Sequence, residues 1–311
     1  MSEQFCDVGR GITLCYETYG EPSNPTALLI MGLGTQMLAW HEDFCEQLAG
    51  RGLHVVRFDN RDIGRSTHLA GRPPSIAQLL TRSKRAAHYT LGDMADDAAG
   101  LLRALDLAPA HVIGASMGGM IAQLLAVRHS QMVRSLTSIM SNTGGIRNGQ
   151  PSLRVYTVFL RRPGEGREAF IAHTERLFKA IGSPGFPRDD ADLHQFATTS
   201  FERDHDPTGP GRQLAAILAS GDRTPQLRGI NVPTLVVHGS ADPLVSPSGG
   251  RATARAIPGA ELMMIAGMGH DLPRGIWPRL TDAIAELAQR ADGEADGHLS
   301  LPTRPPSLSG L

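Results

Sequence analysis

Cysteine is scarce in this chain, and the few cysteines form no pattern. Cys6, Cys15 and Cys45 include no C-x-x-C pair, which excludes a disulfide-stapled scaffold and a cysteine-rich metal site. We therefore expect free thiols in a reducing cytoplasm. One alternative stays open, a disulfide between Cys6 and Cys15 across an N-terminal hairpin.

An excess of charge of one sign and long apolar runs are also missing. Lys and Arg number 30 against 31 Asp and Glu, a formal net charge of −1, so neither nucleic acid nor an anionic membrane is expected as a partner. No stretch approaches the roughly 20 apolar residues that a membrane-spanning helix needs. The first residues hold no basic segment followed by an apolar one, so we expect no secretory signal and a cytoplasmic location.

Metal-ligand spacing is absent as well. The 12 histidines form neither H-E-x-x-H nor another ligand pattern, so neither a metal nor a cofactor is expected. What remains is an ordinary globular composition, 41% hydrophobic and 20% charged, in a chain of 311 residues. That length allows one large α/β domain or two small ones, with a sizeable core.

The most informative feature that is present is the segment 114–119, which reads Gly-Ala-Ser-Met-Gly-Gly and follows an apolar run at 111–113. The pattern G-x-S-x-G is typical of a nucleophile elbow, in which a strand turns sharply into a helix and exposes a serine hydroxyl. Glycines on either side of Ser116 leave room for its strained backbone. The pattern is weak when it stands alone, so its context decides.

That context consists of buried strands that end in polar or glycine-rich loops. The run 27–31 ends in a Gly-Leu-Gly loop, and a helix rich in Ala and Leu follows the elbow at 120–127. Further on, the segment 234–243 contains another buried strand with Asp242 just past its end, and a last strand, 261–265, leads to His270.

The resulting order is Ser116, Asp242, His270. It supplies a nucleophile, an acid that orients a base, and the base that removes the serine proton. Two other acids remain as rivals for the orienting role, Asp271 beside the base and Asp222 in the segment 141–229, which we interpret below as a lid. We predict the triad Ser116, Asp242 and His270 as the catalytic residues.

The oxyanion hole and the substrate contacts are predicted from the same loops. An oxyanion hole needs two backbone N–H groups aimed at the developing negative charge. We expect these from Met117, directly after the nucleophile, and from Leu33, with Gly34 as the fallback. Residues near these donors are predicted to contact substrate: Gly32, Gly34, Met37 and Trp40. Leu38 and Met120 are further candidates for lining the pocket.

Alternating strands and helices predict a mostly parallel sheet covered on both faces, an α/β fold. Strands are expected at 4–8, 12–19, 26–31, 53–58 and 133–140, and helices at 36–50 and 92–106.

The pattern breaks between 141 and 229, which has short helical stretches at 151–161, 165–181 and 189–202, separated by prolines. We predict a core from 1–140 and 230–291, a helical cap (lid) at 141–229 over the ligand crevice, and a flexible tail at 292–311.

The segment 59–66 is dense in polar residues and follows a strand. We interpret it as a hydrogen-bonded loop that braces the site. A dinucleotide-binding enzyme is an alternative, because Gly32-x-Gly34 after one strand and Asp59 after the next resemble half of a nucleotide fingerprint. The third glycine is missing, since position 37 is Met37.

Taken together, these motifs resemble the α/β-hydrolases of the serine esterase type, over nearly all of 1–291. The segments 31–34 and 58–67, the elbow, 238–243 and 267–270 are similar to a bacterial subgroup that includes the aclacinomycin methylesterases. Two departures weaken any transfer of a specific substrate. Met31 stands where many relatives have histidine, and Asp62 where they often have glycine.

The resemblance implies an α/β-hydrolase fold and hydrolysis of a small-molecule carboxylic ester without a cofactor. A thioesterase, a lactonase, a perhydrolase or a carbon–carbon bond hydrolase could use the same groups. A ligand-binding protein with little turnover is another alternative. Ser116 in place of aspartate disfavours dehalogenase and epoxide-hydrolase chemistry. A homodimer is left open.

Overall fold

An eight-stranded sheet forms the centre of the molecule in the computed structural model, which describes residues 2–71, 75, 78, 87–159 and 164–299. The strand order is β1-β2-β4-β3-β5-β6-β7-β8. The first two strands pair in the antiparallel sense and all later pairs are parallel, which confirms the predicted sheet. The strands are β1 (Gln4–Asp7), β2 (Thr13–Tyr19), β3 (Thr26–Ile30), β4 (His54–Phe58), β5 (Ala110–Ala115), β6 (Val133–Ile139), β7 (Thr234–Gly239) and β8 (Glu261–Ile265).

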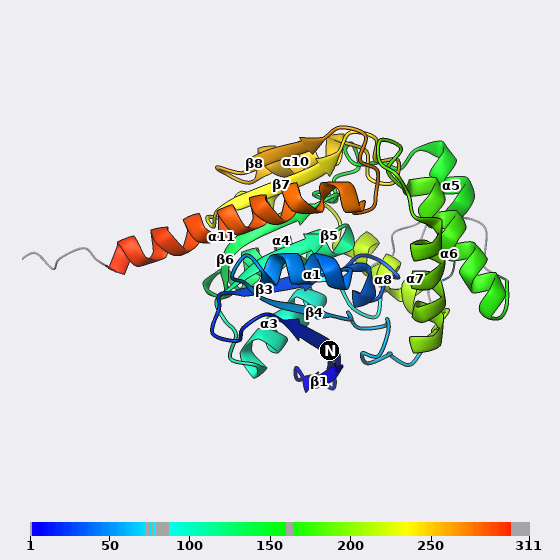
Figure 1. Ribbon diagram of the computed structural model, residues 1–311, viewed down its shortest axis with the longest axis horizontal. Coiled ribbons are helices and arrows are strands. Elements are labelled where there is room, and N and C mark those ends of the chain that lie inside the picture. Colours follow the sequence, from blue (N-terminus) through cyan, green and yellow to red (C-terminus); the bar gives the residue numbers. More distant parts are fainter. Residues whose placement is uncertain (1, 72–74, 76–77, 79–86, 160–163, 300–311) are drawn as a thin grey trace, which may run out of the picture.

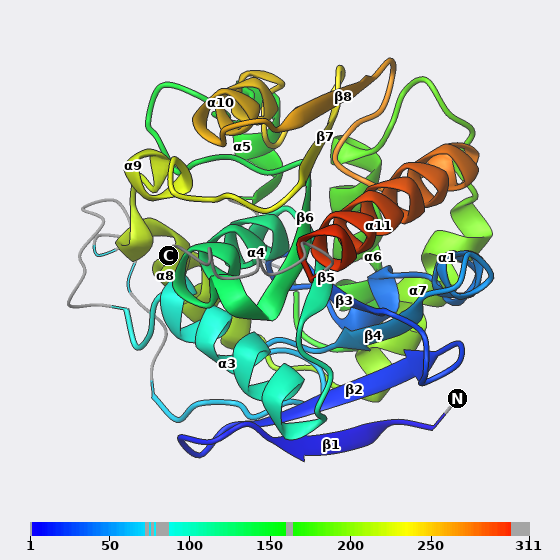
Figure 2. The same ribbon diagram turned by 90° about the vertical axis from the view of Figure 1, so that its left-hand side faces the viewer.

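Helices cover both faces of this sheet (Figures 1 and 2). One face carries α3 (Leu91–Ala104), α4 (Met117–Arg128) and α10 (Ser248–Ala256), and the other carries α1 (Glu42–Ala49) and α11 (Trp277–Leu299). Each face has its own buried apolar cluster. The central strands β3, β4, β5 and β7 are buried along their whole length, as expected for parallel strands between two helical layers.

The helix predicted over 36–50 is divided in two. A short 3₁₀ turn, η1 (Met37–Ala39), comes first, and α1 starts only at Glu42. His41 separates them because its Nδ1 accepts a hydrogen bond from Asp43 N at 3.1 Å, which caps α1. Two further 3₁₀ turns are η3 (Ser130–Met132) and η4 (Arg274–Ile276).

The chain between β6 and β7 is helical. It forms α5 (Leu153–Phe159), α6 (Arg167–Ile181), α7 (Asp190–Arg203), α8 (Gly209–Ser220) and the short α9 (Thr224–Leu227). Figure 1 shows α5, α6 and α7 in green as a separate layer beside one end of the sheet. Pro210, expected to separate two helices, instead lies in the first turn of α8, where its missing N–H is tolerated.

The register of the N-terminal hairpin excludes the disulfide considered above. Cys6 pairs with Leu14 and Cys15 pairs with Phe5. This offset of one residue directs the two cysteines to opposite faces of the sheet. All three cysteines are free and buried.

The boundary predicted for the C-terminal tail, at residue 292, falls inside a helix. Helix α11 continues to Leu299, and Asp292, its expected first residue, accepts a hydrogen bond from Arg134 Nη1 at 3.0 Å. The rest of the predicted tail, 300–311, lies outside the described residues. In the part of the chain that the structure describes, no helix has the length and apolar character to cross a membrane.

Candidate active site

Ser116 occupies a sharp turn between β5 and α4. Its φ of +57° lies in a region that residues other than glycine rarely adopt. A β-carbon on Gly114 would lie 2.2 Å from Gly118 O, and one on Gly118 would lie 2.0 Å from Ile30 O. Only glycine fits at either position, so the motif packs the turn tightly and leaves Ser116 partly exposed at the carboxyl edge of the sheet.

The structure brings His270 and Asp242 to this serine. His270 Nε2 lies 2.9 Å from Ser116 Oγ, and His270 Nδ1 lies 2.8 Å from Asp242 Oδ2. A carboxylate only accepts hydrogen bonds, so we assign the proton to Nδ1, which leaves Nε2 to accept from the serine hydroxyl. The arrangement can therefore remove a proton from Ser116.

Backbone amides hold the carboxylate of Asp242. Its Oδ1 accepts from Leu244 N and Val245 N, both at 2.9 Å, and its side chain is fully buried. His238, on β7, donates from Nε2 to Val245 O at 2.8 Å and so supports the same turn. With Oδ1 occupied by amides, Oδ2 is left to orient the imidazole of His270.

The loop that carries His270 rests on the end of α6. His270 N donates to Ile181 O at 2.7 Å, and Gly269 N donates to Ser183 Oγ at 2.8 Å. A third hydrogen bond runs in the opposite direction, because Gly185 N donates to Gly267 O at 2.9 Å. The helical segment between β6 and β7 therefore supports the position of the histidine.

The two rival acids have other partners. Asp271 accepts a short hydrogen bond from Ser183 Oγ, and burial raises the pKa of its carboxyl. Asp222 Oδ1 accepts from Thr224 Oγ1 at 2.6 Å and from Thr224 N at 2.9 Å. These bonds lower the pKa of Asp222. Among the described residues, Asp242 is the acid that hydrogen-bonds the His270 ring.

The loop after β3 lies against the serine. A β-carbon on Gly32 would be 3.1 Å from Ser116 Cβ. The fallback oxyanion donor, Gly34, is already used, because its N–H donates to Gln213 Oε1 at 2.8 Å. Leu33 N–H has no acceptor among the described residues, and Met117 N–H belongs to the first turn of α4, where no intrahelical acceptor exists.

Two of the predicted substrate contacts belong to the packed interior. Trp40 is fully buried and stacks on Phe44, with ring centroids 5.5 Å apart. Met37 is also fully buried, and its N–H donates to Asp59 Oδ1 at 2.8 Å. Contact of either side chain with a substrate stays a prediction.

The polar segment 59–66 is a hydrogen-bonded loop, as predicted. Asp59 Oδ2 accepts from Arg65 N at 3.0 Å and pairs with Arg203 Nη1 at 2.5 Å. With Met37 N on the other oxygen, the Asp59 carboxylate is buried and fully engaged, so it is not available to a ribose. Asp59 therefore gives the dinucleotide alternative no support.

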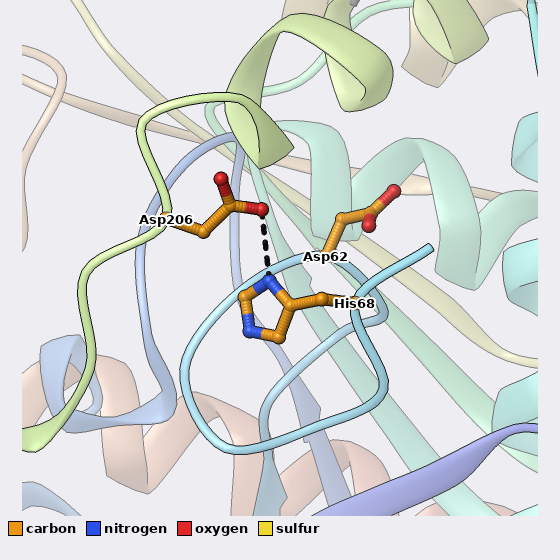
Figure 3. Close-up of side chains that lie close together, drawn as sticks. All are labelled: Asp62, His68 and Asp206. Carbon is orange, nitrogen blue, oxygen red and sulfur yellow. Dashed lines mark hydrogen bonds and ion pairs between the residues drawn. The ribbon is translucent and has the colours of Figure 1, made fainter. Parts of the chain in front are cut away.

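One group of potential metal ligands, which the spacing of residues in the sequence did not indicate, consists of Asp62, His68 and Asp206 (Figure 3). One ligand atom from each lies within 4.8 Å of the others. However, Arg212 Nη2 lies 2.8 Å from Asp62 Oδ1 and 2.9 Å from Asp206 Oδ2. The guanidinium already supplies the positive charge that these carboxylates need, so we interpret the cluster as an ion-pair network.

Asp62 has a φ of +66°, which glycine adopts more readily. Its carboxylate accepts from Leu69 N at 2.8 Å in addition to Arg212. These bonds explain how aspartate is accommodated at this backbone position.

Comparison with known proteins identifies the family. Residues 25–273 match the model of the alpha/beta hydrolase fold family. The chain belongs to this family.

Among similar proteins, a methylesterase confirms the narrower resemblance, and an enol-lactonase is a further relative. Rhodomycin D methylesterase DnrP of Streptomyces peucetius is 27% identical over 300 residues, covering 90% of this chain and 96% of that protein. A 3-oxoadipate enol-lactonase of Acinetobacter baylyi is 26% identical over 247 residues, covering 78% of this chain and 80% of that protein. This hydrolase is thus similar to the methylesterases that the motifs indicated.

Solved structures confirm the fold. The enol-lactonase from Burkholderia xenovorans LB400 superposes with a TM-score of 0.72 at 23% identity, covering 92% of this chain and all of that one. An esterase from Thermogutta terrifontis gives a TM-score of 0.69 at 22% identity, covering 94% and 99% of the two chains.

Proposed function

We propose that this hydrolase is a serine esterase that cleaves carboxylic esters of small to medium size. The observation that carries the proposal is the continuous hydrogen-bond chain from Ser116 Oγ through His270 to Asp242, with separations of 2.9 and 2.8 Å. Similarity to the methylesterases supports ester hydrolysis as the reaction class. The three free thiols support the cytoplasmic location that we propose with it.

In the proposed reaction, Ser116 Oγ attacks the ester carbonyl carbon while its proton passes to His270 Nε2. The N–H groups of Leu33 and Met117 stabilise the oxyanion of the tetrahedral intermediate. As the intermediate collapses, the carbon–oxygen bond to the alcohol breaks, and the alcohol leaves with the proton from His270. A water molecule then gives a proton to His270 Nε2 and attacks the carbonyl carbon of the acyl-enzyme. The bond to Ser116 Oγ breaks, His270 returns the proton to Oγ, and the carboxylic acid is released.

Substitution of the nucleophile or the base tests this proposal. We expect Ser116→Ala and His270→Ala each to lower turnover by about 10³-fold or more while circular dichroism stays unchanged. Hydrolysis of p-nitrophenyl butyrate by the purified variants is the measurement. Turnover close to that of the native enzyme in Ser116→Ala would overturn the assignment.

The size of the substrate follows from the helices between β6 and β7, which we propose to form a cap over the crevice. A roofed pocket suits esters that dissolve as single molecules. We expect activity on acetyl to hexanoyl and aryl esters, falling as the acyl chain lengthens. Fast hydrolysis of triolein with negligible hydrolysis of p-nitrophenyl butyrate would indicate a lipase instead. The same panel should contain a methyl ester, a thioester and an enol lactone, because an enol-lactonase is among the relatives.

A further inference from the structure

The peptide units around Leu33 are held on both sides by hydrogen bonds to side chains, of which Asn60 and Gln213 come from other parts of the molecule. On one side, Met31 O accepts from Asn60 Nδ2 at 2.9 Å. On the other side, Gly34 N donates to Gln213 Oε1 at 2.8 Å, and Leu33 O accepts from Thr35 Oγ1 at 3.1 Å. The Met31–Gly32 and Leu33–Gly34 peptide planes therefore each have a fixed partner.

The peptide between them, which joins Gly32 to Leu33, is the one whose N–H we assign to the oxyanion hole. Among the described residues, no group accepts a hydrogen bond from it. A peptide plane is rigid and turns only about the bonds at its two α-carbons. Holding the peptides before and after it fixes the positions of the two α-carbons that it joins. Leu33 N–H is thereby limited to rotation about the line between these two carbons, and none of these bonds uses that N–H.

Gln213 has both ends of its amide engaged. It is fully buried on α8, and while Oε1 accepts from Gly34, its Nε2 donates to Arg61 O at 2.8 Å. The two partners define the amide orientation, because Gly34 N can only donate and Arg61 O can only accept. The Arg61 side chain is held in turn by two hydrogen bonds of 2.6 Å to Asp97.

The start of α8 is anchored next to this glutamine. Arg212 Nη2 pairs with Asp62 Oδ1 at 2.8 Å, and a β-carbon on Gly209 would lie 1.9 Å from Asp62 O. The helix therefore cannot move away from the loop after β4 without breaking buried polar contacts, and Gln213 is presented from a fixed element.

We propose that Gln213 and Asn60 are positioning residues of the oxyanion hole, and that α8 of the cap is thereby part of the catalytic apparatus. The proposal rests on the proposed esterase function. Since an oxyanion forms only along the reaction path, a misdirected Leu33 N–H weakens transition-state binding more than substrate binding. The loss then falls on kcat and leaves KM nearly unchanged.

The test uses Gln213→Met, which keeps the length of the side chain and removes both hydrogen bonds. We expect kcat to fall by about 10- to 100-fold, less than the loss of an entire oxyanion donor. KM should stay within about threefold. A trifluoromethyl ketone forms an adduct with Ser116 that carries an oxyanion. Its dissociation constant should rise by about the same factor as kcat falls. Rates are to be expressed per active site titrated with a fluorophosphonate.

Gln123→Met is the matched control. Gln123 is also a fully buried glutamine, but its Nε2 donates to Ser138 Oγ at 3.1 Å, away from the oxyanion loop. Its substitution should lower the melting temperature while kcat per active site and ketone affinity stay unchanged. A merely structural role for Gln213 would give the same result as this control, and that result would overturn the proposal.

Asn60→Leu is the second test, because it releases the other flanking peptide. This variant tests the positioning role if Gln213→Met does not fold. We expect it to lose both kcat and ketone affinity, as Gln213→Met does. Unchanged kcat and ketone affinity in the folded variants, with Ser116→Ala inactive, would refute the positioning role alone. An active Ser116→Ala would refute the esterase assignment itself.

Discussion

Asp242 and Asp271 flank His270 from different sides, and their hydrogen bonds predict different roles. Asp242 contacts the imidazole, whereas Asp271 binds Ser183 at the end of α6. We expect Asp242→Asn to lower kcat by about 10⁴-fold, because an amide does not hold the imidazole in the required tautomer. The measurement is ester turnover at the pH optimum. Asp271→Asn is the matched control and should keep turnover within a few-fold, and the reverse pattern would show that the acid is misassigned.

Sequence predicts the triad because its members follow strands that a short apolar pattern reveals. Ser116 sits in a recognisable motif. Asp242 follows the buried strand β7, and His270 follows the last strand, β8, whose first residues are exposed. Gln213 carries no such signal. It lies 179 positions from its partner Gly34 and belongs to a helix that the prolines of the region concealed. Contacts of this kind depend on how the helices between β6 and β7 pack on the rest of the molecule, which no local pattern encodes.

Helix α11 shows the same limit at the scale of an element. Its last part was expected to be a flexible tail, since Gly293 and Gly297 lower helix propensity. The buried side chains of the earlier turns, including Leu280 and Ile284, dock the helix on the sheet. Tertiary packing of this kind lets a helix continue through residues of poor propensity.

The docking of this helix end is testable at Asp292. Its Oδ1 lies 3.0 Å from Arg134 Nη1 and 3.5 Å from Nε2 of the buried His111. We expect Asp292→Ala to lower the free energy of unfolding by about 1 kcal/mol through loss of these bonds, while esterase activity is unchanged. Urea denaturation is the measurement. Glu294→Ala, at an exposed position two residues on, is the control, and equal stability of both variants would contradict the assigned contact.

At the scale of the whole molecule, His68 joins the loop after β4 to Asp206, in the helical segment between β6 and β7. Burial lowers its pKa, but the bonds to Gly64 O and Asp206, with the charges of Asp204 and Asp206, outweigh burial and raise it. Arg212 is the cation that shares Asp206 with it. A raised pKa in the folded state means that the charged imidazole stabilises the fold at acid pH. This stabilisation is lost as the pH rises through the folded value.

We therefore expect His68→Asn to be more destabilising at pH 5.5 than at pH 9. The difference should be about 0.5–1 kcal/mol, since the imidazole is only partly shielded from water. Thermal unfolding at the two pH values measures it. His194→Asn is a suitable control, because His194 pairs with Glu175 on the exposed side of α6 and α7, away from the core. An equal effect of His68→Asn at both pH values would show that its charge does not contribute.

The two ends of the helical segment leave and re-enter the core side by side, because Arg223 N donates to Thr143 O at 2.8 Å. Because the ends of the inserted segment are adjacent, a longer or different segment can be inserted between them with little additional entropic cost of closing the loop. In this protein such an exchange is constrained by two ion pairs. Asp59 and Asp62 are buried acids of the core, and their guanidinium partners, Arg203 and Arg212, belong to the inserted segment. A different helical segment inserted at this junction must supply two arginines at the same places. Without them, two buried carboxylates of the core would lack their ion-pair partners.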